Sequence, residues 1–409
     1  YKVMEGNRMV ASGKNKLLEY AVLIYVFCSM MAGSSGDTIT KVGRVILILA
    51  FLAVNLKRVV IKKTTKFYIG WAVSFLFYAY AGCITAYSKS YATTFSITLT
   101  YVVICDIAVL LSVARDEQLK RAVLHTIVLS ATCKALVCYL QYGFLYFLTA
   151  RFTETTSANT LGYYCAFACV ICFYFLESQS YHRGVYGGLI FLNVVFLTLS
   201  ASRKAIMFLI IPVAIMWIAK SKNPLVVIKN IFMAALAVLI ILALLLNVDF
   251  LYTMMGYRVE GMINAFLGTG VVDASTNTRI GLIEDGLSWF SKKPIFGYGL
   301  SNFKALCAVY RSWGSVYYAH NNYVELLVDC GIVGTLIYYS LHIKLLWTGI
   351  LNWKKMDKEQ LMFLGMLLSM IICDYGMVTY FDIFSQLMLV LVYVSFSNLQ
   401  HIKMQRIRQ

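Results

Sequence analysis

A histidine and two arginines occupy positions in the sequence where they could support acid–base chemistry on an anionic substrate. His320 closes the longest polar interruption of an otherwise apolar chain, directly before a new apolar stretch. Arg203 stands at the start of another apolar stretch, and Arg279 opens an amphipathic segment. A neutral imidazole can accept a proton, and a guanidinium group is suited to binding a phosphate or pyrophosphate through two parallel hydrogen bonds. If the three side chains share one face, they predict a base beside a pair of phosphate-binding groups.

Each of these residues also has a plainer interpretation. His320 could be an interfacial residue that only hydrogen-bonds a loop carbonyl. An arginine at a membrane boundary often extends its charged group to the interface and anchors a helix there. Two arginines that depart from the usual charge bias, on the same face as a histidine, favour the functional interpretation.

The segment after His320 predicts the start of a helix. Asn322 is followed three residues later by Glu325, which is the spacing of a capping box, so the helix is expected to begin near Tyr323. His320 and Asn321 would then lie at the positive end of the helix dipole, where the charged imidazolium is disfavoured and the ring stays neutral. Glu325 is expected to cap the helix rather than to act as a base.

The composition excludes a soluble globular protein. Of the 409 residues, 60% are hydrophobic and 13% are charged, and the mean hydropathy is +0.73. A soluble protein carries about twice that share of charged residues. Because apolar runs recur along the whole chain, the sequence predicts an all-α polytopic membrane protein with one transmembrane domain over residues 1–409. The formal charge of +17 lies mostly in alternate connections, the positive-inside pattern, which argues against nucleic acid as a partner.

About twelve transmembrane helices are predicted from the hydropathy pattern. The basic residues favour a cytoplasmic N-terminus and a cytoplasmic C-terminus, with the even-numbered connections inside. Residues 57–66 carry the strongest orientation signal. The predicted spans are Leu17–Gly33, Val42–Leu56, Phe67–Tyr87, Phe95–Val113, Ala122–Thr149, Leu161–Leu176, Val185–Leu199, Arg203–Ala219, Leu225–Asn247, Asn322–Thr348, Leu361–Thr379 and Phe381–Ser397.

One long connection, residues 248–321, lies between the ninth and tenth spans and is predicted to face outside. A loop of this length in a compact protein is usually functional or disordered, and its aromatic content argues against disorder. The other outer connection of some length, Arg151–Thr160, carries Glu154. The long connection is therefore the expected place for an extracytoplasmic site.

Two short helices are predicted within the long connection. The first runs from Thr278 to Ser291 on the outer membrane surface and ends before Pro294. Gly297 and Gly299 then predict a tight turn that leads into the second helix. The apolar face of the first helix is expected to consist of Ile280, Ile283, Leu287 and Phe290.

Other residue types that could do chemistry give weaker signals. The outer connections contain no Asp-x-Asp motif and no His/Cys cluster with metal-ligand spacing, so neither a metal site nor a cofactor is expected. The 11 cysteines lie almost entirely in apolar stretches, where they are expected to be small packing residues. Charges within predicted spans are often functional, but Asp106 and Lys134 could pair with each other. Asp374 and Asp382 are expected near the outer boundary.

Several short motifs in this chain resemble those of one superfamily. Their order, their spacing and the long outer connection are similar to those of the O-antigen ligases and the O-antigen or capsular polysaccharide polymerases, which are polytopic membrane glycosyltransferases. The resemblance covers the architecture of the full chain and, for motifs, residues 203–334. The motifs are Ser202-Arg203 at the start of a span, Arg279, the run Pro294-Ile295-Phe296-Gly297-Tyr298-Gly299 with Asn302-Phe303, the segment His320-Asn321-Asn322-Tyr323 with Glu325, and Gly331 with Gly334.

The resemblance implies a GT-C-like transferase that needs no metal ion and uses an undecaprenyl-diphosphate-linked oligosaccharide as donor. Arg203 and Arg279 would bind the donor diphosphate and stabilise it as it leaves. His320 would accept the proton of an acceptor hydroxyl, with inversion at the anomeric carbon. The supporting residues would be Asn321, Asn322, Tyr323, Glu325, Gly297 and Gly299.

The resemblance also implies a location and partners. The protein would lie in the bacterial cytoplasmic (inner) membrane, in contact with membrane lipid, and its site would face the outside or the periplasm. A chain-length regulator or a flippase would be a compatible further partner.

The motifs do not separate a polymerase from a ligase, because both use the same donor and differ in the acceptor. Ile and Tyr are abundant and Pro is scarce, a composition compatible with an AT-rich genome. It is compatible with a capsule-bearing Gram-positive bacterium, where repeat-unit polymerases are the common members, so a polymerase is favoured and a ligase is the alternative. Intramembrane charges would also suit a transporter or flippase, but the sequence shows no convincing internal repeat.

Overall fold

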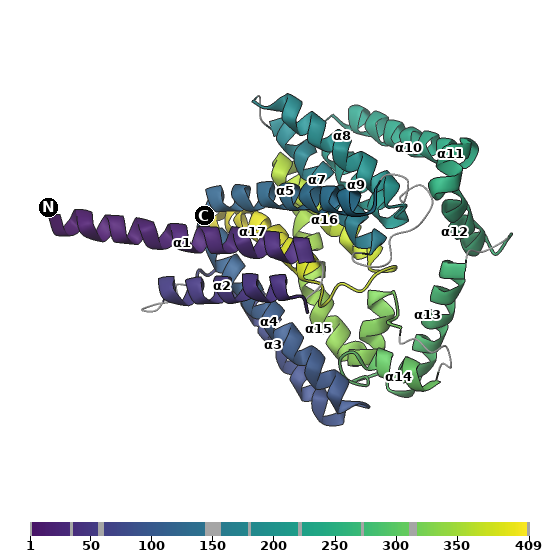
Figure 1. Cartoon of the computed structure of the whole chain (residues 1–409), viewed down its shortest axis with the longest axis horizontal. Coiled ribbons are helices and arrows are strands. Elements are labelled where there is room, and N and C mark those ends of the chain that lie inside the picture. Colours follow the sequence, from purple (N-terminus) through teal and green to yellow (C-terminus); the bar gives the residue numbers. More distant parts are fainter. Residues whose placement is uncertain are drawn as a thin grey trace.

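The computed structural model describes residues 2–32, 36–55, 61–143, 157–178, 181–219, 223–270, 274–310 and 317–406. In these ranges the chain forms helices and no strand (Figure 1). The elements are α1 (Lys2–Ala32), α2 (Thr38–Asn55), α3 (Lys66–Thr85), α4 (Lys89–Val113), α5 (Glu117–Tyr142), α7 (Ala158–Ser178), α8 (Arg183–Leu199), α9 (Arg203–Ile218), α10 (Pro224–Asn247), α11 (Asp249–Leu251), the π-helical turn η1 (Tyr252–Gly256), α12 (Tyr257–Leu267), α13 (Ala274–Lys292), α14 (Asn302–Tyr310), α15 (Asn322–Asn352), the 3₁₀ turn η2 (Trp353–Lys355), α16 (Lys358–Cys373) and α17 (Ile383–Arg406).

The predicted all-α polytopic class is confirmed. Each predicted span falls on one helix, namely α1 to α5, α7 to α10, or α15 to α17. Among the described residues, seven helices are long and apolar enough to cross a membrane: α2, α3, α4, α5, α7, α10 and α15. The helix predicted over Ala122–Thr149 ends at Tyr142, and residues 144–156, which include Glu154, lie outside the described residues.

Helices α7 and α17 supply the most completely buried side chains of the bundle. Non-glycine residues from 161 to 172 on α7 are at most 4% exposed, and those from 387 to 392 on α17 are at most 1% exposed. A helix that is apolar all round is expected to be buried in this way. Cys165, Cys169 and Cys172 lie in this core, and all 11 cysteines of the chain are free thiols, which confirms their packing role.

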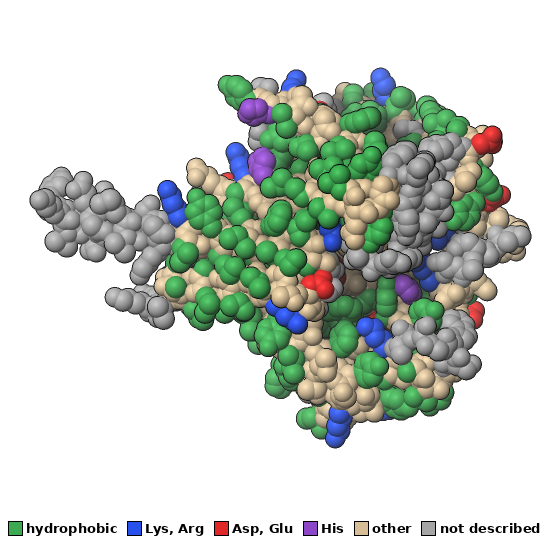
Figure 2. All heavy atoms as spheres, in the orientation of Figure 1, with side chains coloured by type: hydrophobic (Ala, Val, Ile, Leu, Met, Phe, Trp, Pro, Cys, Tyr) green, Lys and Arg blue, Asp and Glu red, His purple; other side chains and the backbone are tan. Residues whose placement is uncertain are grey.

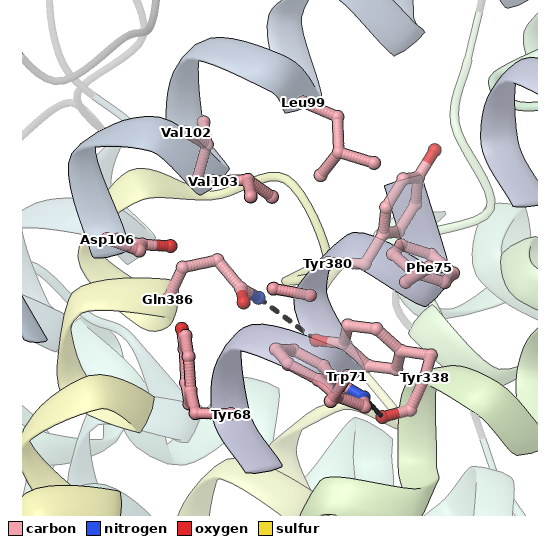
Figure 3. Close-up of a pocket in the computed structure, with 11 residues that line it drawn as sticks. Tyr68, Trp71, Phe75, Leu99, Val102, Val103, Asp106, Tyr338, Tyr380 and Gln386 are labelled. Carbon is pink, nitrogen blue, oxygen red and sulfur yellow. Dashed lines mark hydrogen bonds between the residues drawn. The ribbon is translucent and has the colours of Figure 1, made fainter. Parts of the chain in front are cut away.

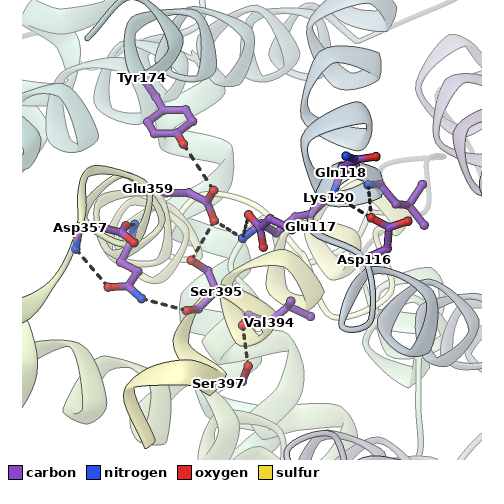
Figure 4. Close-up of polar contacts among 12 residues, drawn as sticks. Asp116, Glu117, Gln118, Lys120, Tyr174, Asp357, Glu359, Val394, Ser395 and Ser397 are labelled. Atoms are coloured by element: carbon purple, nitrogen blue, oxygen red, sulfur yellow. Dashed lines mark hydrogen bonds and ion pairs between the residues drawn. The ribbon is translucent and has the colours of Figure 1, made fainter. Parts of the chain in front are cut away.

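The basic connections assigned to one side of the membrane by the sequence meet at one end of the bundle. The Lys62 ammonium donates a hydrogen bond to the carbonyl oxygen of Ala114 (3.0 Å), which joins the α2–α3 and α4–α5 connections. Lys120 of α5 forms an ion pair with Glu359 of α16 at 2.5 Å, beside Tyr174 of α7 (Figure 4). The α2–α3 and α4–α5 connections and the start of α16, which the charge pattern places on one side of the membrane, therefore lie at the same end of the bundle.

The α3–α4 connection lies at the other end, where it contacts the long connection. The backbone N–H of Tyr87 donates to the carbonyl oxygen of Tyr298 (2.9 Å), and the N–H of Ser88 donates to Oδ1 of Asn302 (2.6 Å). The long connection is thus packed onto the bundle as an ordered part of it.

The predicted helix in the long connection is present as α13, and the apolar stripe that packs into the protein lies beside the stripe expected on the membrane surface. Ile280 and Leu287 are 38% and 48% exposed, whereas Leu282 and Trp289 are 0% and 6% exposed. Two neighbouring stripes of this helix are apolar, and residue spacing alone does not tell which stripe faces protein. The inner stripe packs into a small core with Tyr298, Phe303, Leu306, Cys307, Ala319, Val324 and Val328.

Helix α15 is interrupted at Gly331, which has φ 63° and ψ −171°. At such a break, the carbonyls before it and the N–H groups after it lose their helical partners. The run from Pro294 to Gly299 inserts its backbone here and supplies all four partners. The bonds run from Ile332 N–H to Pro294 O (2.8 Å), from Val333 N–H to Ile295 O (3.2 Å), from Tyr298 N–H to Val328 O (2.9 Å) and from Gly299 N–H to Asp329 O (2.7 Å).

This insertion explains the glycines of the predicted tight turn. Gly297 has φ 72°, and a Cβ atom there would lie 2.6 Å from the carbonyl carbon of Asp329. Gly299 has φ 93°, and its Cβ would lie 2.6 Å from Cβ of Ala86. Gly331, from the last of the motifs, breaks a helix.

Replacing Gly331 by alanine is therefore expected to prevent correct folding. The new Cβ would overlap the carbonyl group of Ile295, in a backbone region that is essentially restricted to glycine. The yield of monodisperse protein in detergent should collapse. Gly70→Ala on α3 is the matched control, because a Cβ there meets no atom within 4 Å and alanine favours a helix by about 1 kcal/mol. Normal yield of the Gly331 variant would contradict the proposed need for the break.

The expected pairing of Asp106 with Lys134 is wrong. The Lys134 ammonium donates to the carbonyl oxygen of Met31 at 2.5 Å, and the opposite charge that acts on Asp106 belongs to Arg44. Asp106 lines a cavity of about 10 Å³ among aromatic side chains of α3 and α15 (Figure 3), which is room for about one water molecule.

Candidate active site

His320 adopts a strained backbone conformation where the long connection enters α15. Its φ of 53° lies in the left-handed region, which few residues other than glycine occupy. The half-buried imidazole lies against Tyr318, with 3.9 Å between the ring centroids. Strain of this kind costs about 1–3 kcal/mol and persists only where the surroundings fix it.

Glu325 and Asn321 fix the chain on the two sides of His320. Glu325 is fully buried and accepts a hydrogen bond from the backbone N–H of Ala319 (2.7 Å). The side-chain oxygen of Asn321 caps α15 by accepting from two N–H groups of its first turn, at 3.0 and 3.1 Å. The predicted capping box is therefore wrong: Asn321 is the cap, the helix begins at Asn322, and Glu325 bonds to the loop.

Asn322 is free to make a different set of contacts because it does not cap the helix. It is fully buried, and its amide donates to Tyr339 Oη (2.8 Å) and Asp374 Oδ2 (3.3 Å). Its oxygen accepts from the backbone N–H groups of Thr379 (2.9 Å) and Tyr380 (3.2 Å). Asn322 therefore holds the α16–α17 connection against the start of α15. Two further bonds support the same junction, from Tyr339 Oη to Asp374 Oδ2 (2.8 Å) and from Tyr323 Oη to Ile371 O (2.5 Å).

Asn322→Ala is expected to destabilise the protein by several kilocalories per mole. Two backbone N–H groups would lose their acceptor in the interior, and each unsatisfied group costs about 1–3 kcal/mol. The melting temperature in detergent should fall by several degrees. Asn247→Ala is the matched control, since Asn247 is exposed and bonds only within α10; equal melting temperatures for the two variants would refute this role of Asn322.

Arg203 and Lys204 form the first turn of α9. Cations at this positive end of a helix cost about 0.3–1 kcal/mol each, so their presence favours a bound anion, for which helix N-termini are suited. The Lys204 ammonium donates to the carbonyl oxygen of Gly376, in the connection that Asn322 also holds. The Nη atoms of Arg203 lie 3.3 and 3.4 Å from Oγ1 of Thr276 on α13.

Arg279 lies on the same face of α13 as Thr276, one helical turn later. It acts electrostatically on both Tyr318 and His320. The structure therefore brings Arg203, Arg279 and His320 to one place, although they come from three separate parts of the sequence. Their chemical roles stay predictions.

The environment of His320 keeps its ring neutral. Burial, and then the positive charges of Arg279 and Lys204, lower its pKa from 6.5 to about 3. A neutral ring was expected from the helix dipole; the structure adds burial and the two cations as causes. Burial also raises the pKa of Tyr318, so this phenol stays protonated beside the imidazole.

Sequence reasoning missed part of this site. Lys204 directly follows Arg203, and the doubled charge at the start of an apolar stretch was a usable signal. No sequence signal pointed to the contact between Asn322 and Asp374, because they are brought together only by tertiary packing. The other supporting residues divide into two groups: Asn321, Tyr323 and Glu325 hold the start of α15, and Gly297 and Gly299 hold its break.

Figure 2 shows a hollow on one face of the molecule, with histidine and Lys or Arg side chains beside it. The site itself combines a neutral base with several cations. It could bind an anionic leaving group and remove a proton from an incoming hydroxyl.

Residues 188–339, from α8 into α15, match the family model described as O-antigen ligase. This region contains Arg203, Arg279 and His320. No curated protein matches the chain. The match confirms the resemblance drawn from the motifs: residues 188–339 are similar to the O-antigen ligase family, which supports a membrane enzyme of the ligase or polymerase type.

Proposed function

We propose that the chain is a polysaccharide repeat-unit polymerase. It transfers a glycan from an undecaprenyl-diphosphate-linked donor to the non-reducing-end sugar of a second lipid-linked repeat, at the outer face of the bacterial cytoplasmic membrane. The observation that carries this proposal is the convergence of His320, Arg203, Lys204 and Arg279 within the family domain. No metal ion is expected to be needed, because three side-chain cations already face the position proposed for the diphosphate.

The reaction divides among these side chains. The unprotonated ring nitrogen of His320 accepts the proton of the acceptor hydroxyl while the oxygen forms a bond to the anomeric carbon. On the opposite side of that carbon, the bond to the diphosphate oxygen breaks and its electron pair leaves with undecaprenyl diphosphate, so the configuration inverts. Arg203, Lys204 and Arg279 stabilise the charge that grows on the leaving group. The imidazolium then releases its proton to water.

A ligase would share this donor side and differ only in the acceptor. The test offers purified protein the lipid-linked donor together with a fluorescent repeat unit that carries no diphosphate. A polymerase extends the fluorescent unit by whole repeats. A ligase leaves it unchanged and transfers the glycan only when a different acceptor, such as a lipid A core, a wall glycan or a protein, is added.

A further inference from the structure

Lys304, in the first turn of α14, presents a cation that the mechanism above does not use. Its Nζ lies 4.6 Å from the ring centroid of Phe95, 5.7 Å from that of Phe381 and 5.9 Å from that of Tyr318. These distances are in the range of cation–π attraction. The three rings come from α4, from the α16–α17 connection and from the loop before α15, so several distant segments fix the position of one ammonium group.

Among the residues that the structure describes, the Lys304 ammonium has no hydrogen-bonding partner. Within the described part of the chain, no hydrogen bond or ion pair engages it, and the side chain is half-buried. Glu325 attracts it electrostatically without a direct bond. One carboxylate oxygen of Glu325 accepts from Ala319, and the other has no hydrogen-bond partner among the described residues. Aromatic rings stabilise the charge of Lys304 but leave its three N–H donors unused.

Lys304 shares Tyr318 with the proposed base. The Tyr318 ring lies 3.9 Å from the ring of His320 and 5.9 Å from Nζ of Lys304. The charges that act on His320 are those of Arg279 and Lys204, which belong to the proposed diphosphate side. Lys304 instead stands with Phe95 and Phe381. The site therefore has two cationic positions. Arg279 and Lys204 form the one proposed for the donor diphosphate, and Lys304 forms a second one, beside Tyr318, that the same oligosaccharide could reach.

We propose that Lys304 recognises an anionic group on the acceptor glycan, so that the substrate class of this site is an acidic repeat unit. This inference rests on the proposed function. The shared chemistry is a carboxylate, as in a uronic acid, or a phosphate substituent. The ammonium would donate charge-assisted hydrogen bonds to that group while the acceptor hydroxyl faces His320.

The test compares matched acceptors with matched variants. One acceptor is a repeat unit that ends in a uronic acid, a second carries a phosphate in that position, and a third has the carboxyl group reduced to the neutral alcohol. Lys304→Met removes the charge and keeps an unbranched apolar stem. Lys293→Met is the control, because Lys293 also lies over a ring, at 4.8 Å from the Tyr298 centroid, but is exposed.

Lys304→Met is expected to raise KM for the matching acidic acceptor about 10- to 100-fold, with little change in kcat or in KM for the donor. The neutral acceptor should bind wild type and variant equally, Lys304→Arg should retain most of the selectivity, and Lys293→Met should behave as wild type. The acidic acceptor whose KM rises most in Lys304→Met identifies the anionic group that Lys304 recognises. Equal loss with acidic and neutral acceptors would show a structural role, and a raised donor KM would assign Lys304 to the diphosphate; either result overturns the proposal.

Equilibrium binding of the same oligosaccharides, without donor, separates this inference from the proposed function. Charge-selective binding that depends on Lys304 would support the inference even if the wild type transferred nothing. Equal binding of acidic and neutral oligosaccharides by the wild type would overturn it even if transfer were robust.

Discussion

His320→Asn is expected to lower the rate of glycan transfer about 10²- to 10⁴-fold, which is the usual contribution of a general base, while the protein stays folded. Asparagine tolerates the left-handed backbone region better than most residues, so the φ of 53° at this position can be kept. Its amide cannot accept the proton of the acceptor hydroxyl. The rate should be measured at saturating donor, together with the melting temperature.

A matched histidine provides the control for this experiment. His182 also has a positive φ, 60°, and is exposed at the start of α8, at the opposite end of that helix from Arg203. His182→Asn should leave both rate and melting temperature unchanged. If His320→Asn kept a tenth or more of the wild-type rate, His320 would not be the base.

Arg279→Gln is expected to lower kcat by about 10²- to 10³-fold, as for loss of one group that stabilises the charge of a transition state. It should also change the pH dependence. Arg279 is the first positive charge that lowers the pKa of His320, so its removal makes the imidazolium easier to form. The variant should therefore lose kcat/KM at a higher pH than the wild type as the solution is acidified.

The sign of this effect follows from the free enzyme. With the pKa of His320 at about 3, the ring of the wild type is neutral throughout the range from pH 7 to about pH 5, and its kcat/KM should not fall there through protonation of His320. A bound diphosphate offsets the positive charges of the cations and raises the pKa of His320. On acidification, kcat, which reports the substrate complex, should therefore begin to fall at a higher pH than kcat/KM, which reports the free enzyme. This fall at low pH is called the acid limb.

Arg279→Lys separates charge from geometry. Lysine keeps the positive charge, so the acid limb should stay near its wild-type position, but it cannot replace the two parallel hydrogen bonds of a guanidinium group. Full activity of this variant would refute bidentate binding by Arg279, and an unshifted acid limb in Arg279→Gln would refute its electrostatic effect on His320.

The helices of this protein were predictable because the membrane demands long apolar segments, and hydropathy reports those directly. Each predicted span lies on a helix, and Arg203, Arg279 and His320 converge. The predicted capping box failed because Asn321 and Asn322 are both good caps, and the choice depends on Asp374, which lies far away in the sequence. The protein-facing side of α13 was not predicted, because Ile280 and Leu282 belong to neighbouring apolar stripes.

The break in α15 marks another limit of sequence reasoning. The sequence predicts a tight turn at Gly297 and Gly299 and includes Gly331 in a motif, but it does not predict that the three glycines lie together. In the structure they allow the backbone of residues 294–299 to insert into the break of α15. Such an exchange of hydrogen bonds between segments leaves no periodic pattern in the sequence. Lys304 was missed for a related reason, since the rings that hold it come from three separate segments.

The most direct test of the central claim is a reaction with purified protein in detergent and a synthetic undecaprenyl-diphosphate-linked repeat unit, without added metal. The account predicts release of undecaprenyl diphosphate and a ladder of products that differ by one repeat, both absent with His320→Asn. Release with a different acceptor, but no ladder, would contradict the polymerase and favour a ligase. No release with any acceptor would contradict glycan transfer altogether and favour a membrane transporter or flippase.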